Sequence, residues 1–490
     1  MLFSDIDFFS VLWYNVLDDP QSGGSHWGKV QMKRIQTSAM TEGPFFRKIV
    51  LFAIPVTLTG LLQIVYNTAD TAVVGHFAGK TALAAVGSTG SMIGLIVNLF
   101  TGLSMGAGVL TARMLGAKDK AGTHRAVHAA MALSLLSGCL IAAIGVPLSP
   151  TLLRWMQAPA DTIDLSKLYV RIYFLGAPGS MVFNFGAAII RSTGDTQRPL
   201  KYLGVSGLLN LLLNLFTIIV LHWGVAGVAI ATIASQYLSA VLAVRHLMKT
   251  ESDVRLQLRQ LRFSRDALTE ILRIGVPAGL QNALFSISNV IIQSNVNSFG
   301  SDAMAGISAG SNYDAYIYTA TNGFTQAAMT FVSQNVGAKK KENIRRIWQI
   351  SLGSAAAAAA ILQTFGFLMR VPIVHLFTAD PAVTAIGAQR MAQIMPFFIF
   401  CSLLDVTSGA VRGLGRSFQI MLVSLFGACG LRLIWVFFFL PMNRTLTFLY
   451  IAYPLSWGIT FLIASALFLG LTREKQLDRL FAEHDSPRTA

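Results

Sequence analysis

One acidic residue lies inside a long apolar segment near the start of the chain. Asp70 is the single charge in residues 49–74, and Gln63, Tyr66 and Asn67 precede it. An acid at membrane depth is costly in lipid and normally faces a protein interior or a water-filled cavity. Such a carboxylate can bind a proton or, with oxygen neighbours, a monovalent cation. Asp70 is therefore a candidate coupling site; the alternative is that it lies at the outer end of the span and only contacts water.

Two amides in a later apolar segment could support this acid. Asn210 and Asn214 are four residues apart, which places them on one face of a helix. Their amides can donate to Asp70 or offer carbonyl oxygens to a cation. The equal alternative is that they join helices, a contact typically worth under about 2 kcal/mol. With Asn67, these residues complete the candidate coupling set, and we expect no other metal site.

Other polar side chains lie in segments that should cross a membrane, and we expect some of them to line a substrate cavity. The candidates are Gln63, Tyr66, Gln281, Asn289, Gln293, Tyr316 and Asp405. Asp405 is taken as the other intramembrane acid; it lies two helical turns before Arg412, so an ion pair is as good an explanation as transport. Arg171, Arg390 and Arg432 lie near segment ends, where long basic side chains can reach the interface.

The composition indicates the elements that must position these residues. Of 490 residues, 53% are hydrophobic and only 12% are charged, whereas a soluble domain carries about a quarter charged residues. This predicts an all-α integral membrane protein. The net charge of +15 lies in short connections between apolar runs, a pattern that sets membrane topology and does not indicate nucleic-acid binding.

Apolar runs of spanning length recur about twelve times, and each should form a helix. The runs are 49–74, 86–112, 125–148, 168–190, 200–220, 224–247, 270–299, 304–334, 347–369, 386–410, 418–440 and 446–470. Every second connection is rich in Lys and Arg, and the alternate ones are poor in them. By the positive-inside rule, this predicts a multi-pass protein of the inner or plasma membrane with both termini cytoplasmic.

The two halves of the chain repeat one another. IPVTLTGLLQIVYN at 54–67 aligns with VPAGLQNALFSISN at 276–289, and LGAK at 115–118 aligns with VGAK at 336–339. Two six-helix bundles related by a pseudo-two-fold axis should result, with the substrate path between them. The position that matches Asp70 is Ile292, so only the first half carries the acid.

The repeat and the polar segments define the expected domains. These are a disordered N-terminal extension at 1–40, a six-helix lobe at 41–248, a cytoplasmic linker at 249–265, a second six-helix lobe at 266–471 and a cytoplasmic tail at 472–490. Residues 1–39 lack the character of a secretory signal, because acids stand where positive charge is expected. Met40 is therefore expected to be the natural start.

Several motifs in order resemble the bacterial multidrug and toxic compound extrusion (MATE) transporters over about residues 41–470. They are FAIPVTLTGLLQIVYNTADTAVVGHFAG, GAKDK, RSTGDTQRP, NLLLN, GVAGVAIATIASQY, FVSQNVGAKK and VRGLGRS. The resemblance implies twelve helices in two lobes and efflux of organic, often cationic, compounds in exchange for protons or sodium. The family's acid in the first helix falls on Asp70. One branch has an aspartate where this chain has Asn214, and another has an acid in the seventh helix, where this chain has only neutral residues such as Gln281 and Asn282.

We therefore expect a cation-coupled antiporter that is not an enzyme, needs no cofactor besides H⁺ or Na⁺, exports small organic molecules and acts as a monomer in the bilayer. The alternative is a flippase for lipid-linked sugar intermediates, which would require a strongly basic cavity. A channel or receptor is disfavoured by the internal repeat. The sequence contains no phosphate loop, HExxH motif or paired nucleophile and base, which argues against an ATP-driven pump or an enzyme.

Overall fold

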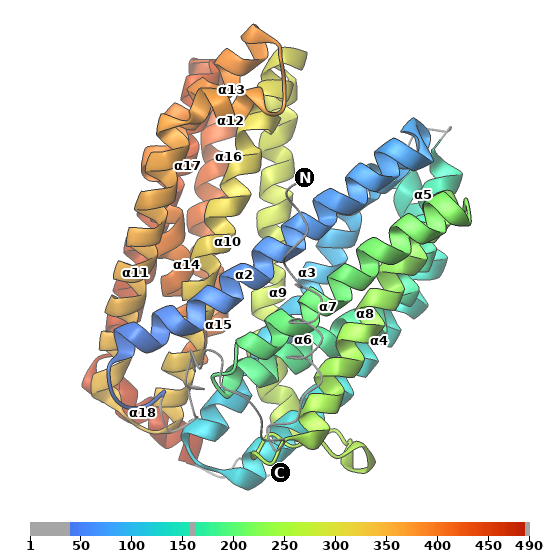
Figure 1. The fold of residues 1–490 in the computed structure, drawn as a ribbon. Helices are drawn as coiled ribbons and strands as arrows, with labels where there is room; N and C mark the ends of the chain where they lie inside the picture. Colours follow the sequence, from blue (N-terminus) through green and yellow to red (C-terminus); the bar gives the residue numbers. More distant parts are fainter. Residues whose placement is uncertain (1–39, 157–161, 486–490) are drawn as a thin grey trace, which may run out of the picture.

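The computed structural model describes residues 40–156 and 162–485, and their regular secondary structure is helical. Twelve long helical segments, six in each half, confirm the predicted two-lobe membrane architecture. Figure 1 shows the two sets of helices meeting at one end of the molecule and diverging toward the other.

The N-terminal half contains the first six segments. They are α2 (Phe45–Val73), α3 (Lys80–Gly116), α4 (Lys120–Trp155), the pair α5 (Ile163–Leu175) and α6 (Ala177–Ser192), α7 (Gln197–Leu215) and α8 (Gly224–Lys249). The α5–α6 pair bends by 45°. The bend is explained by Gly176 between the two helices and by Pro178, which fits only the first turn of a new helix.

The C-terminal half repeats this order. It contains α9 (Arg265–Asn297), α10 (Ser301–Gly337), α11 (Lys341–Leu368), the short α12 (Arg370–His375), α13 (Pro381–Ile394) with α14 (Phe398–Gly413), α15 (Ser417–Ser424) with α16 (Leu431–Ile434), α17 (Leu446–Leu471) and the terminal α18 (Glu474–Asp485). Pro396 interrupts α13 and α14 in a short 3₁₀ turn at Met395–Phe397.

Nine of the described helices are long and apolar enough to cross a bilayer, or ten if the bent α5–α6 pair counts as one span. The helices α9 and α10 are as long, with 33 and 37 residues, but they are less apolar and are not among these nine. They carry many of the amides and tyrosines that the sequence assigns to a cavity. Their lower hydropathy therefore follows from the candidate polar residues themselves.

The internal repeat is visible in reciprocal backbone contacts. A Cβ on Gly116 would lie 2.0 Å from the carbonyl oxygen of Gln334, and a Cβ on Gly337 would lie 1.9 Å from that of Arg113. Gly116 and Gly337 occupy equivalent positions of the two repeats, and so do Arg113 and Gln334. Contacts that exchange equivalent residues are the signature of a two-fold axis, here a pseudo-axis between the ends of α3 and α10.

The halves also cross closely along α3 and α9. A Cβ on Gly279 would lie 2.1 Å from the carbonyl oxygen of Leu99, and one on Gly106 would lie 2.3 Å from that of Ile271. Small residues permit such close backbone approach between helices in membranes. The buried ion pair of Arg113 and Glu270, at 2.9 Å, joins the same two helices near this end.

We call the end of the molecule where these contacts lie the basic face, because Lys and Arg lie in or beside each of its connections: Lys118 and Lys120, Arg191 and Arg198, Arg255 and Arg259, Lys339 and Lys340, and Arg412 and Arg416. In Figure 1 this end bears α18, while α5, α12 and α13 lie at the opposite end. The first helix, α2, begins at the basic face and runs across to the N-terminal half (Figure 1). Its early residues Phe45, Ile49 and Phe52 belong to the core of the C-terminal half, whereas Val74, directly after it, belongs to a core of the N-terminal half.

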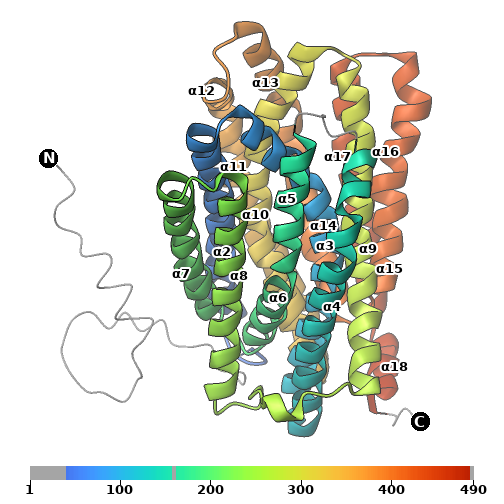
Figure 2. The ribbon, with the colours of Figure 1, turned by 90° about the vertical axis from the view of Figure 1, so that its right-hand side faces the viewer.

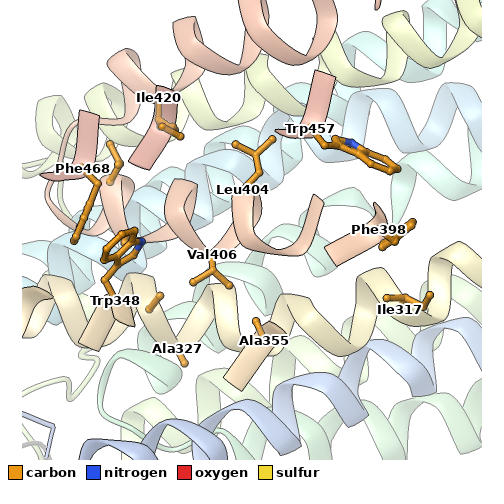
Figure 3. Close-up of a cluster of buried hydrophobic side chains, with 14 of the residues drawn as sticks. Ile317, Ala327, Trp348, Ala355, Phe398, Leu404, Val406, Ile420, Trp457 and Phe468 are labelled. Atoms are coloured by element: carbon orange, nitrogen blue, oxygen red, sulfur yellow. The ribbon is translucent and has the colours of Figure 1, made fainter. Parts of the chain in front are cut away.

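Aromatic and aliphatic side chains hold the C-terminal half together (Figure 3). The rings of Trp348 and Phe468 lie 4.8 Å apart, and those of Phe398 and Trp457 lie 5.3 Å apart. Trp348 Nε1 donates to Thr407 Oγ1 at 3.2 Å, so its polar atom is satisfied inside the core. Leu477, Leu480 and Phe481 of α18 extend this core, so the expected tail at 472–490 contains a packed helix.

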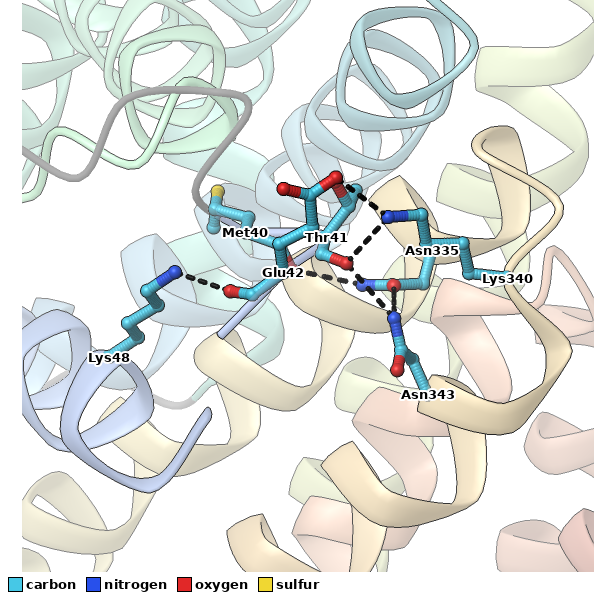
Figure 4. Close-up of polar contacts among 7 residues, drawn as sticks. All are labelled: Met40, Thr41, Glu42, Lys48, Asn335, Lys340 and Asn343. Atoms are coloured by element: carbon cyan, nitrogen blue, oxygen red, sulfur yellow. Dashed lines mark hydrogen bonds and ion pairs between the residues drawn. The ribbon is translucent and has the colours of Figure 1, made fainter. Parts of the chain in front are cut away.

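The residues that precede α2 are fastened to α10 and α11 (Figure 4). Met40 is fully buried, and its carbonyl oxygen accepts from Asn335 at 3.1 Å. Lys340 Nζ donates to Thr41 O at 3.1 Å and to Glu42 Oε1 at 3.0 Å. This lysine contact lowers the pKa of Glu42 below its ordinary value. The disordered extension was expected at 1–40; Met40 is instead ordered and buried, and residues 1–39 lie outside the described residues. Met40 as the natural start stays a prediction.

Candidate functional site

Asp70 lies in the last turn of α2 and faces α7. Asn214 Nδ2 donates to Asp70 Oδ1 at 2.6 Å. The Asn210 amide is best oriented with its nitrogen toward the carboxylate. That nitrogen then donates to Asp70 Oδ1 at 2.7 Å and to Asp70 Oδ2 at 3.2 Å. Asn210 and Asn214 share one face of α7 because they are four residues apart, about one helical turn, and this face meets Asp70. Their role in binding a coupling ion stays a prediction.

The constellation is buried on one side and open on the other. Asn210 and Asn214 are 5% and 0% exposed, whereas Asp70 is half-buried. Both amides are neutral, so their hydrogen bonds orient the carboxylate without neutralising it. Asn214 Oδ1 is buried and has no hydrogen-bond partner among the described residues. A buried acceptor is costly when it is unpaired, and a bound cation or a nearby proton donor would satisfy it.

Tyr66, one helical turn before Asp70, fixes the position of α2 on α7. The Tyr66 hydroxyl donates to the carbonyl oxygen of Gly204 at 3.1 Å. The Tyr66 ring lies directly over Gly207, where a Cβ would come within 1.9 Å of it. Tyr66, expected in the substrate cavity, therefore contacts α7 with both its ring and its hydroxyl. Gly207 is a positioning residue that sequence reasoning missed, since nothing in the chain signals which ring covers it.

Both helices change their winding directly after the constellation. Residues Val74–Ala78 follow α2 and Phe216–Val220 follow α7 as single π-helical turns. Such turns frequently accompany functional sites in helices. On the N-terminal side of Asp70, Gln63 and Asn67 are exposed, so neither belongs to the buried amide pair.

The remaining candidates lie in the C-terminal half and differ in their burial. Asn289, Gln293 and Tyr316 are exposed on α9 and α10. Gln281 is buried: it donates to Ser424 Oγ at 2.8 Å and accepts from Arg412 Nη2 at 2.8 Å. Gln281 therefore contacts the protein interior rather than a cavity surface.

Asp405 is half-buried in α14. Arg412 lies two turns further along the same helix, and its Nη2 donates to Gln281. Both explanations given for Asp405, an ion pair and a transport role, stay open.

A further acid inside the membrane was missed by sequence reasoning. Asp314 lies in α10 and pairs with Arg390 Nη2 at 2.5 Å, with side chains that are 21% and 7% exposed. Asp405 is thus not the only intramembrane acid besides Asp70. Asp314 could have been recognised as an acid within the apolar run 304–334. Its polar neighbours made it less conspicuous than Asp70.

The expectation that Arg390 and Arg432 extend to the interface is wrong, because they are 5% and 3% exposed. Arg432 Nε donates to Ser456 Oγ at 3.0 Å, and its guanidinium lies 4.6 Å from the ring centre of Tyr453 and 5.4 Å from that of Trp457. Aromatic faces and hydrogen bonds thus hold this cation in the interior. Arg432 also donates to Asn289 at 3.4 Å, which links a candidate cavity residue to the core.

Comparisons with known proteins agree with the repeat and the fold. The MatE family model matches residues 55–216 and again residues 277–438, one match in each half. A probable multidrug resistance protein NorM of Thermotoga maritima is 28% identical over 394 residues, covering 78% of this chain and 83% of that protein. A probable multidrug resistance protein YpnP of Bacillus subtilis is 26% identical over 387 residues, covering 79% and 86%.

Solved structures show the same fold at low sequence identity. An outward-facing multidrug resistance MATE family transporter of the MOP superfamily superposes with a TM-score of 0.83 at 23% identity, covering 91% of this chain and 99% of that chain. A MOP superfamily transporter from Pyrococcus furiosus, described by the reverse polarity of its binding pocket, gives 0.82 at 23% identity with 92% and 99% coverage.

Proposed function

Because the chain belongs to the MatE family of membrane transporters, we propose that it is a cation-coupled antiporter that exports small organic, often cationic, molecules. The observation that carries the proposal is the half-buried Asp70 carboxylate held by Asn214 and Asn210. Two relatives are named as multidrug resistance proteins, and we extend that substrate class to this chain. The protein acts as a monomer and uses no group besides H⁺ or Na⁺.

Asp70 is the group that binds the coupling ion. A proton would bind the carboxylate directly, and Asn214 Oδ1 can then accept a hydrogen bond from the protonated acid. A sodium ion would take the carboxylate together with the same amide oxygen, which are the hard oxygen ligands that such cations prefer. Either ion would satisfy the one buried oxygen of the constellation that has no partner among the described residues.

The substrate path runs between the two halves. Polar side chains exposed at membrane depth are expensive in lipid and are expected to face water. Gln63, Asn67, Asn289, Gln293 and Tyr316 are such residues. We infer that they line an aqueous cavity between the halves.

The basic face is the cytoplasmic one, by the positive-inside rule. Both termini are then cytoplasmic, and the helices diverge toward the outside. Exchange follows if ion and substrate favour different arrangements of the two halves, because each can shift that equilibrium only by its differential affinity.

The interior arginines bear on the flippase alternative. Such a protein needs free positive charge in its cavity to hold a phosphate-linked substrate. Arg390 is paired with Asp314, Arg412 with Gln281, and Arg432 with Ser456 and two aromatic rings. These contacts direct the arginines into the C-terminal half, so antiport of organic cations is the better supported reading.

Proteoliposomes loaded with a fluorescent organic cation test the proposal. A pH gradient and a sodium gradient are imposed separately on the wild type, Asp70→Asn and the matched control Asp164→Asn. Asp164 is an exposed acid on α5, where it pairs with Lys167. We expect efflux driven by one gradient in the wild type and the control, and at least a tenfold loss in Asp70→Asn. Efflux by the wild type at the same rate with and without either gradient would refute cation coupling. Full efflux by Asp70→Asn would show that Asp70 does not bind the coupling ion.

A further inference from the structure

A groove of about 400 Å³ lies on the outer surface of the N-terminal half. It is formed by α4, α6 and α8, and Figure 2 shows α6 between α4 and α8 on the side that faces the viewer. Leu135, Pro178, Gly179, Tyr237 and Val241 contribute to its apolar lining. The groove is separate from the α2–α7 constellation.

The groove exists because two positions on α6 leave space. Pro178 starts α6 just after the bend, and Gly179 has no side chain. A Cβ on Gly179 would lie 3.1 Å from the Tyr237 ring, so the absence of a side chain at Gly179 lets that ring pack against α6. The Tyr237 hydroxyl donates to the carbonyl oxygen of Leu175 at 2.9 Å, which holds the ring across the α5–α6 break.

The apolar part of the groove faces lipid. Val241 is 59% exposed, Leu135 43% and Tyr237 42%, and α4 and α8 are both helices that can span the bilayer. A hollow at this depth is unfavourable when empty, since its lining atoms lose van der Waals contacts. An acyl chain is the molecule that the surrounding bilayer supplies to fill it.

One end of the groove carries two cations. Arg245 and Lys249 line it, both are exposed, and both lie in the last two turns of α8 at the basic face. Among the described residues no acidic side chain lines the groove. The groove therefore combines an apolar channel with positive charge at its end.

The spacing fits one leaflet of a bilayer. Arg245 follows Tyr237 by eight residues, which is about 12 Å along a helix at roughly 1.5 Å per residue. Half of a hydrocarbon core of about 30 Å is roughly 15 Å. An acyl chain that lies along Val241 and Tyr237 thus places its headgroup beside Arg245 and Lys249. Basic pockets between transmembrane helices at this level recognise anionic lipid headgroups.

We propose that this groove binds an anionic diacyl phospholipid of the leaflet at the basic face, with its phosphate on Arg245 and Lys249 and one acyl chain over Tyr237 and Pro178. A free phosphate does not explain the apolar length of the groove. A zwitterionic lipid also carries a phosphate, but its own cation offsets that charge beside Arg245 and Lys249. The proposal is independent of the coupling ion and of the exported substrate.

The test compares phosphatidylglycerol with phosphatidylcholine on the purified full chain. Bound lipid is counted by native mass spectrometry during titration with each lipid. The variant is Arg245→Gln/Lys249→Gln. The matched control is Arg255→Gln/Arg259→Gln, which removes two exposed cations from the linker after α8 without touching the groove. A phosphatidylglycerol with a photoreactive acyl chain locates the bound chain by peptide mapping.

We expect preferential binding of phosphatidylglycerol by the wild type and the control. Removal of both groove cations should weaken the tightest site about 10- to 30-fold, at roughly fivefold for each basic residue near the surface. Photoadducts should map to peptides containing Leu135, Pro178 or Tyr237. Equal binding of both lipids, unchanged selectivity in Arg245→Gln/Lys249→Gln, or adducts confined to other helices would each overturn the proposal.

Discussion

Replacing Gly207 with alanine tests how α7 positions Asp70. The added Cβ would lie 1.9 Å from Cε2 and 2.2 Å from Cζ of Tyr66. Carbon atoms in contact lie about 3.5–4.0 Å apart, so the ring must move by roughly 2 Å. That movement carries the Tyr66 hydroxyl away from the Gly204 carbonyl and pushes α2 from α7.

The expected cost follows from two opposing effects. Overpacking a well-filled site typically costs about 1–3 kcal/mol, while replacing a helical glycine by alanine alone contributes roughly 0.5–1 kcal/mol of stability. We expect Gly207→Ala to destabilise the protein by about 1–2 kcal/mol. The 2.6 Å contact of Asn214 with Asp70 lies one turn further along α2 and two turns further along α7, so cation-driven export should fall with it.

A neighbouring glycine provides the matched control. Gly204 lies on the same helix three residues earlier, and a Cβ there meets nothing within 4 Å. The same substitution at Gly204 should be neutral or stabilising. Thermal unfolding in detergent and gradient-driven efflux are measured for Gly204→Ala, Gly207→Ala, Tyr66→Ala and the Tyr66→Ala/Gly207→Ala double variant.

The double variant isolates the steric contact. Once the ring is gone, the alanine at Gly207 should cost little more than Tyr66→Ala alone, so the two effects should be clearly non-additive. Additive losses would show that the ring does not lie over Gly207. Equal losses from Gly204→Ala and Gly207→Ala would refute the argument from geometry altogether.

Three further predictions concern the contacts that join and stabilise the halves. Gly106→Ala should separate the halves at the basic face, measured as a longer spin-label distance and reduced efflux, whereas Gly94→Ala, with nothing within 4 Å of its Cβ, should change neither. Asp314→Asn should destabilise the C-terminal half by about 3–5 kcal/mol by leaving Arg390 buried without its charge partner; the double variant with Arg390→Gln should recover much of this, and full additivity in unfolding experiments would contradict the pairing. Glu42 has a lowered pKa, so its contribution to stability is present above the ordinary glutamate pKa of 4.5 and is lost as the pH falls through the lowered value. The difference in melting temperature between wild type and Glu42→Gln should therefore vanish in acid. A difference that grows in acid would contradict the direction of this pKa shift.

The helices and the proximity of Asp70 to Asn210 and Asn214 could be predicted from sequence because their signals are local. An acid in an apolar run identifies Asp70, and a spacing of four identifies Asn210 and Asn214 as one face. Alternating charge and the internal repeat then give the number of spans and their arrangement in two lobes. Each of these inferences needs only neighbouring residues or a comparison of the chain with itself.

The missed features depend on contacts between residues far apart in the chain. Asp314 and Arg390 are separated by 76 residues, and neither sequence neighbourhood indicates the pairing. From its position near a segment end, Arg432 is expected at the membrane interface. In the structure its guanidinium instead packs against the rings of Tyr453 and Trp457. The beginning of α2 packs in the core of the C-terminal half although it belongs to the first repeat, an exchange that no local pattern reveals.

If Asp70 binds the coupling ion, substrate binding should displace that ion from the protein. An organic cation is added to the purified protein, and released protons or sodium are measured with a pH dye or an ion-selective electrode. We expect release of one kind of ion by the wild type and by Asp164→Asn, and none by Asp70→Asn, which should still bind the compound. Release that persists in Asp70→Asn, or substrate binding by the wild type with no release of either ion, would contradict the central claim.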